Sequence, residues 1–216
     1  MKAAPRASGS RPTIYRPLPR RFFARNTVQV ARALLGQFLV HETRLGRVVG
    51  RIVETEAYRG PLDPASHAYR RTARSEVMYG EPGVAYIYFS YGMHYCMNVV
   101  TEGRGRAGAV LLRAVEVVER ADSAGSGQHG RAGPRAGSIP SRLAAGPGRV
   151  TAAMRVGPAH NGADLTRPPL YLARGDRPAG RIVTGPRVGI SLAQTRPWRF
   201  GIAGHPSLSR PFRAPL

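Results

Sequence analysis

The first regular pattern along the chain is a helical spacing of apolar residues after Asn26. The stripe follows the i, i+3, i+4, i+7 rule and consists of Ala31, Leu34, Leu35 and Phe38. Asn26 stands where a helix N-cap is favoured, because its side chain can accept a hydrogen bond from a free backbone N–H. We therefore predict a first helix that ends between Gly36 and Leu39.

Residues 38–58 change to a β-rich pattern, with two runs separated by a turn around Leu45 and Gly46. Side chains alternate between the two faces of a strand. Strict alternation would put four residues on one face, Ile52, Glu54, Glu56 and Tyr58, with Val53 and Thr55 on the other. The two carboxylates are then neighbours, unless a bulge turns one away.

The remaining segments favour further strands joined by loops, without an internal repeat. A polar loop covers about 59–83, and residues 83–100 predict two strands that meet near Tyr91 and Gly92. Residues 107–119 predict another strand that runs into a helix, and 181–204 predict strand and turn that close the sheet. Between Leu143 and Met154 we expect a short helix, with Gly146 and Gly148 on the turn before it.

At 216 residues the chain fits one domain, for which we expect residues 22–205. Residues 1–21 carry six basic side chains, four prolines and no acid, which predicts a flexible basic tail; the prolines do not fit an amphipathic transit helix. Residues 121–142 are rich in Gly, Ser and Arg and predict a surface insertion. Residues 206–216 are expected to form a second tail.

The charge balance points to a polyanionic partner, because Lys and Arg outnumber Asp and Glu by 33 to 12, a formal charge of +21. Nucleotide-composition bias in the genome is an alternative source for part of this arginine excess. The single cysteine, Cys96, excludes an internal disulfide framework. With no apolar run of membrane-span length and no secretory signal pattern, we expect a cytoplasmic, nucleoid-associated protein of bacterial type.

The sequence lacks the residues needed for metal binding, for a Schiff-base reaction and for a phosphate-binding loop. The six histidines are scattered without paired ligand spacing, so we expect no metal site and no cofactor. Lys2 is the only lysine, which makes a Schiff-base lyase reaction improbable. The GPGR turn at Gly146 lacks the Lys-Ser/Thr ending of a phosphate-binding loop.

A set of ordered segments spans most of residues 22–203: ARALLGQFLV, GRIVETEAY, DPASHAY, AYIYFSYGMHYCMN, LLRAVE, AGPGR and RVGI. In this order they resemble the alkyladenine (3-methyladenine, or methylpurine) DNA glycosylase family. The resemblance implies an α+β fold: a single mixed domain with a largely antiparallel curved β-sheet, flanking helices and a protruding β-hairpin. It also implies a monomeric, monofunctional hydrolase of base excision repair, acting on double-stranded DNA. Its expected substrates are alkylated or deaminated purines such as 3-methyladenine, 7-methylguanine and hypoxanthine.

The same resemblance assigns site residues. Glu56 matches the general base that activates water against the C1′ carbon, and Arg113 matches the arginine that helps to position the water and the sugar-phosphate. Glu54 matches no catalytic role, and we interpret it as a strand residue that pairs with an arginine. Tyr58, His67 and Tyr88 match residues that sandwich the flipped base.

Three further matches concern selectivity and DNA contact. Asn98 matches the residue that crowds the 2-amino group of normal guanine. Tyr91 matches the intercalating residue that fills the hole in the base stack, with Met93 beside it in the minor groove. The chain departs from the family pattern at Ala73, Ser75 and His94, which leaves the conformation of the first loop and the minor-groove contacts open.

Two alternative functions remain at the level of sequence. A non-enzymatic, basic nucleic-acid-binding protein would explain the charge and the exposed tyrosines, but not two acids placed together in a cationic chain. A helix-hairpin-helix glycosylase or nuclease is suggested only by the Gly-x-Gly turn in LAAGPGRVTAAM. That single turn is weak support, since the catalytic helix pattern of those proteins does not occur.

Overall fold

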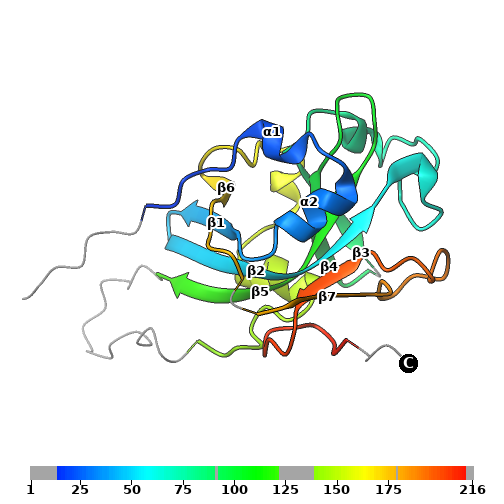
Figure 1. Ribbon diagram of the computed structural model, residues 1–216. Helices are drawn as coiled ribbons and strands as arrows, with labels where there is room; N and C mark the ends of the chain where they lie inside the picture. Colours follow the sequence, from blue (N-terminus) through cyan, green and yellow to red (C-terminus); the bar gives the residue numbers. More distant parts are fainter. Residues whose placement is uncertain (1–13, 91, 122–138, 179, 213–216) are drawn as a thin grey trace, which may run out of the picture.

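The computed structural model describes residues 14–90, 92–121, 139–178 and 180–212. Within them, one curled, eight-stranded antiparallel sheet carries helices on its flanks, as Figure 1 shows. The helices are α1 (Arg20–Phe23), α2 (Thr27–Ala33) and α3 (Pro147–Ala153), with short 3-10 turns at Gly60–Leu62, Glu76–Tyr79 and Pro158–His160. The predicted α+β class with a largely antiparallel sheet is confirmed.

The strands run in the order β3-β4-β5-β2-β1-β6, and β8 pairs with both β2 and β7. Their bounds are β1 (Phe38–Thr43), β2 (Gly46–Tyr58), β3 (Ala85–Ser90), β4 (His94–Val100), β5 (Ala109–Arg120), β6 (Leu170–Ala173), β7 (Ile182–Gly185) and β8 (Arg199–Ile202). The long strand β2 is central: β5 pairs along one side, while β1 and then β8 share the other. Strands β3 and β4 form the predicted hairpin.

Helix α2 covers one face of this sheet. The Asn26 side chain accepts a hydrogen bond from the N–H of Val28 at 3.0 Å, which confirms the predicted N-cap. Val30 and Ala31 are buried in the main core, and the hydroxyl of Thr55 on β2 donates to the carbonyl of Ala31 at 2.8 Å. Thr55 therefore points toward α2, and its neighbours on β2 point toward the other face.

The predicted helix ends earlier than its apolar spacing indicates. It stops at Ala33, Gly36 takes a positive φ of 83°, and Phe38 begins β1 instead of completing the helix. Phe38 is half-buried at the start of β1, so it continues the apolar spacing without belonging to the helix. The predicted strand of 107–119 remains a strand to Arg120 and does not turn into a helix, because β2 pairs with it throughout.

Two predictions about local geometry were wrong, one on β2 and one at the start of α3. Strict alternation along β2 fails between Ile52 and Thr55, where the register with β5 shifts twice. Ile52 consequently joins the main core instead of the face that carries the acids. Near α3, Gly146 is the N-cap but Gly148 lies inside the helix rather than on the turn.

The ordered domain extends beyond the expected boundaries at both ends. Most of the expected insertion (122–138) and the outer parts of the expected tails (1–13 and 213–216) lie outside the described residues. Residues 14–21 nevertheless belong to the domain, since Leu18 is buried and its N–H donates to Leu172 at 2.8 Å. At the other end, Ser207 and Leu208 are buried as well.

Among the described residues, none of the helices has the length and apolar character needed to cross a bilayer.

The sheet core generates a stability prediction. Leu112 on β5 is fully buried in the main core, so Leu112→Ala should lower the free energy of unfolding by about 2–5 kcal/mol through lost burial and a cavity. Leu45→Ala is the matched control, because Leu45 is 59% exposed in the β1–β2 turn and should change stability little. Equal losses of stability in urea denaturation would contradict the assigned packing.

Candidate active site

A cavity of about 820 Å³ lies beside the β3–β4 hairpin and the second half of β2. Five of the residues predicted from sequence line it: Tyr58, His67, Tyr88, Asn98 and Arg113. The loop before residue 67 and the segment 188–192 close its sides. A cavity of this size is typical of small-molecule binding sites.

Strand register explains why residues far apart in sequence meet here. Paired residues across adjacent strands give one continuous row over five strands, in the order Tyr86, Asn98, Leu111, Glu56 and Arg199. Directly opposite residues of antiparallel strands project to the same face of a sheet. The row therefore places an aromatic ring, an amide, a carboxylate and a guanidinium on one surface.

Glu56 lies behind the wall of this cavity and is fully buried. Its Oε2 accepts a hydrogen bond from the Tyr58 hydroxyl at 2.8 Å, and its Oε1 accepts one from the Val188 N–H at 2.8 Å. Arg113 Nη1 lies 3.4 Å from the same Oε1. Burial raises the pKa of Glu56 above its ordinary value, against the opposing effects of Arg113 and the two hydrogen bonds.

Glu54 points to the same side of β2 as Glu56, since both contact Arg113. Arg113 Nε lies 3.1 Å from Glu54 Oε1, and Arg199 Nε lies 2.7 Å from that oxygen. Glu54 therefore has the arginine partner that the sequence led us to expect. The adjacent acids are separated by Arg113, which contacts both.

The opposite wall of the cavity is aromatic. The rings of His67 and Tyr88 meet edge to face with centroids 4.5 Å apart, and His67 Nδ1 lies 2.8 Å from the hydroxyl of Tyr86. His67 is exposed, but the protein around its ring removes part of its water. This desolvation, and secondly the charge of Arg74, lower the pKa of His67 to about 4. The imidazole is therefore neutral at pH 7. Asn98 is buried, and its amide donates to the carbonyl of Tyr86 at 3.1 Å.

A buried ion pair supports Tyr58 from behind. The Arg187 guanidinium lies 4.6 Å from the centre of the Tyr58 ring. It donates to Asp63 Oδ1 at 2.8 Å and to the carbonyl of Ala57 at 2.9 Å. Because Val188 follows Arg187 directly, the same pair helps to aim the Val188 N–H at Glu56.

The residues predicted to contact DNA belong to the β3–β4 hairpin. Met93 is 76% exposed in the turn between the strands, whose last pair is Ser90 with His94. Tyr91, the predicted intercalating residue, lies outside the described residues. His94 itself lines the cavity.

Several residues of the site have no counterpart in the sequence predictions. Tyr86 could have been found, because it lies two residues before Tyr88 and so shares its strand face. Val188 contributes a backbone N–H, which no side-chain pattern reveals. Asp63 and Arg187 are 124 positions apart and meet only in the folded chain. Within the described part of the chain, no three His, Cys, Asp or Glu side chains gather as a metal ion would need.

Comparison with known proteins gives one family and many similar chains. The model of the family described as methylpurine-DNA glycosylase (MPG) matches residues 21–206. A Streptomyces avermitilis protein named "Putative 3-methyladenine DNA glycosylase" is 46% identical over 204 residues, which cover 92% of each chain. Proteins of the same name from Rhodopseudomonas palustris and Leifsonia xyli are 44% and 47% identical, over 91% and 87% of this chain and 92% and 89% of their own.

The buried ion pair behind Tyr58 generates a prediction. Asp63→Asn leaves the Arg187 charge buried without its counterion, so the free energy of unfolding should fall by about 3–5 kcal/mol. Glu76→Gln is the control, because it removes the same charge from an exposed pair with Arg71 and should leave unfolding nearly unchanged. Urea denaturation of both variants checks this, and similar losses would show that the Asp63 pair is not specifically important.

Proposed function

The chain belongs to the methylpurine-DNA glycosylase family, and from this we propose that it flips alkylated or deaminated purines out of duplex DNA and excises them. As a member of that family it is a DNA glycosylase, a hydrolase of N-glycosyl bonds with DNA as its substrate. The proposed substrates are 3-methyladenine, 7-methylguanine and hypoxanthine, and the product is an abasic site.

The observation that carries the chemical proposal is the Glu56 carboxylate, buried directly behind Tyr58 and Arg113, which line the cavity. In the proposed reaction a water oxygen bonds to C1′, the bond from C1′ to the purine nitrogen breaks, and the water proton passes to Glu56. The purine takes the electron pair of the broken bond. Glu56 must be ionised to accept a proton, and Arg113 at 3.4 Å favours that form.

The aromatic wall supports the proposal of a flipped purine. Tyr58, His67 and Tyr88 line one cavity, and aromatic faces stack on an electron-poor alkylated ring. Asn98 is proposed to reject normal guanine by crowding its 2-amino group. The hydrogen bond from its amide to the Tyr86 carbonyl supports this role, because it keeps the side chain from turning away.

The neutral state of His67 bears on which purines leave readily. With a pKa of about 4, His67 can donate a hydrogen bond at pH 7 but is not an imidazolium acid. A cationic alkylated purine leaves as a neutral base without a proton from the protein. Hypoxanthine requires protonation, so we propose that it is excised more slowly.

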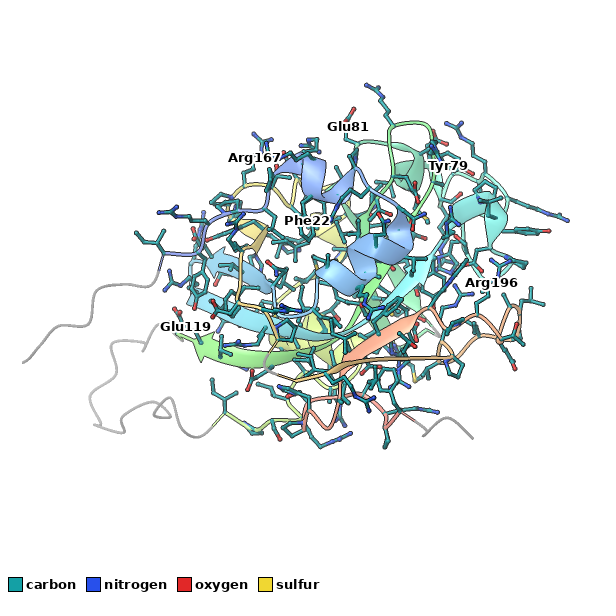
Figure 2. All side chains as sticks on the ribbon, in the orientation of Figure 1. Phe22, Tyr79, Glu81, Glu119, Arg167 and Arg196 are labelled. Carbon is teal, nitrogen blue, oxygen red and sulfur yellow. The ribbon has the colours of Figure 1, made fainter. Side chains whose placement is uncertain are left out.

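The proposed DNA contacts follow from the hairpin and the charge. Tyr91 is proposed to insert into the base stack, with Met93 in the minor groove, and the exposed position of Met93 supports this. Arginines such as Arg167 and Arg196 lie at the periphery in Figure 2, and the formal charge of +21 supports attraction to phosphates. Because Lys2 is the only lysine, a Schiff-base lyase step is not part of the proposal.

The first test concerns Glu56. In single-turnover release of 7-methylguanine or hypoxanthine from duplex DNA, Glu56→Gln should lower the rate by about 100-fold or more while lesion binding persists. In the wild type the rate should fall as pH drops through the Glu56 pKa, which burial holds above the ordinary carboxyl value.

Glu81→Gln is the control for this test, since Glu81 lies at the periphery in Figure 2 and should leave the rate unchanged. A wild-type rate in Glu56→Gln would refute the assignment of the base. A wild type that binds the duplex but releases none of these purines would refute the proposed substrates.

The second test concerns Tyr91. Tyr91→Ser should weaken binding to lesion-containing duplex more than binding to undamaged duplex, because filling the gap left by a flipped base matters only when a base is flipped. Fluorescence anisotropy with both duplexes measures the two affinities. Equal losses would make Tyr91 a general DNA contact.

A further inference from the structure

The segment His205–Phe212, here called the C-terminal clasp, crosses the face of the sheet that carries the acids. Figure 1 shows it in red on the side away from α1 and α2. Arg199 of β8 holds its backbone, since Nη2 donates to the carbonyl of Arg210 at 2.5 Å and the guanidinium lies 4.0 Å from the centre of the Phe212 ring. The family match ends at residue 206, before most of this segment.

Ser209 brings the clasp onto Glu54 through two hydrogen bonds. Its backbone N–H donates to Glu54 Oε2 at 2.6 Å, and its hydroxyl donates to Glu54 Oε1 at 2.8 Å. Glu54 is fully buried, so each donor replaces water that the carboxylate has lost. The clasp therefore helps to keep a charged group inside the protein.

The same hydroxyl also contacts Arg113. Ser209 Oγ accepts from Arg113 Nη2 at 3.2 Å while it donates its own proton to Glu54. The guanidinium is thus fixed on one side by Glu54 and Ser209 and presents Nη1 to Glu56 on the other. A hydroxyl suits this position because it can donate and accept at once.

We infer that Ser209 and Glu54 are positioning residues, which hold Arg113 against Glu56, so that the C-terminal clasp completes the active site. This inference rests on the proposed roles of Glu56 and Arg113. Without the hydroxyl, Arg113 Nη2 loses this acceptor and Glu54 Oε1 loses a donor. Arg113 is then less constrained to remain beside Glu56, while Glu54 keeps Arg199 and the Ser209 N–H.

Two features of the reaction should change together in Ser209→Ala. The single-turnover rate constant should fall about tenfold, the scale of a lost hydrogen bond that orients a catalytic group, with lesion affinity unchanged. The acid limb of the rate should also move to higher pH, because a guanidinium further from Glu56 favours its ionised form less and its pKa rises.

Ser207→Ala is the matched control. Ser207 belongs to the same clasp and is fully buried, but its hydroxyl has no hydrogen-bond partner among the described residues. Its loss should alter neither the rate constant nor the pH profile. Ser209→Thr and Ser209→Val are a second matched comparison, because Thr and Val have nearly the same shape. Only Thr keeps a hydroxyl, so only Ser209→Thr should retain the rate constant.

The experiments distinguish failure of the inference about Ser209 from failure of the proposed function. A wild-type rate constant and pH profile in Ser209→Ala would overturn the inference, as would a loss confined to reaction amplitude, which reports only fewer folded molecules. Equal rate constants in Ser209→Thr and Ser209→Val would also overturn it. Failure of the proposed function looks different, because then the wild type releases no purine or Glu56→Gln remains active.

Discussion

Two carboxylates buried side by side on one face of β2 impose the constraint on which much of this structure depends. Removing an ionised carboxylate from water costs several kcal/mol, so Glu54 and Glu56 each need cations and donors inside the protein. Arg113 on β5 lies between them, and Arg199 on β8 serves Glu54. The pairing of β2 with β5 on one side and β8 on the other thus brings both arginines to the acids, near the register shifts of β2.

Because of this constraint, three buried acids are each paired with a buried arginine. Glu54, Glu56 and Asp63 are balanced inside by Arg113, Arg199 and Arg187, so these six buried groups sum to zero. The formal excess of +21 consequently belongs to the rest of the chain. A protein that only binds phosphates gains nothing from three buried carboxylates, each of which needs a buried arginine beside it. Their presence is better explained by chemistry at the cavity than by binding alone.

Short-range sequence patterns correctly predicted the elements that form through interactions between residues close in sequence. The Asn26 cap and the apolar spacing gave α2, and alternation gave the β3–β4 hairpin, because both signals act within a few residues. The predictions failed where pairing with a strand far away in the sequence determines the secondary structure. Phe38 belongs to β1, and the residues near Arg120 stay in a strand, because β2 pairs with both segments. The site residues came from resemblance, not periodicity. Val188 and Ser209 were missed because their contribution exists only after the sheet has brought them to the acids.

Tyr58 links the neutral and the charged halves of the site. Its ring lines the cavity and packs against the Arg187 guanidinium, while its hydroxyl donates to Glu56. Any base stacked on that ring therefore rests on a side chain whose orientation also sets the hydrogen bonding of the carboxylate. The rings of His67 and Tyr88 add no charge of their own at pH 7, which suits the proposed purines, since these differ in charge. In the proposed reaction, acceptance of the base and activation of the water are thus joined through one tyrosine, and a change at Tyr58 should affect both.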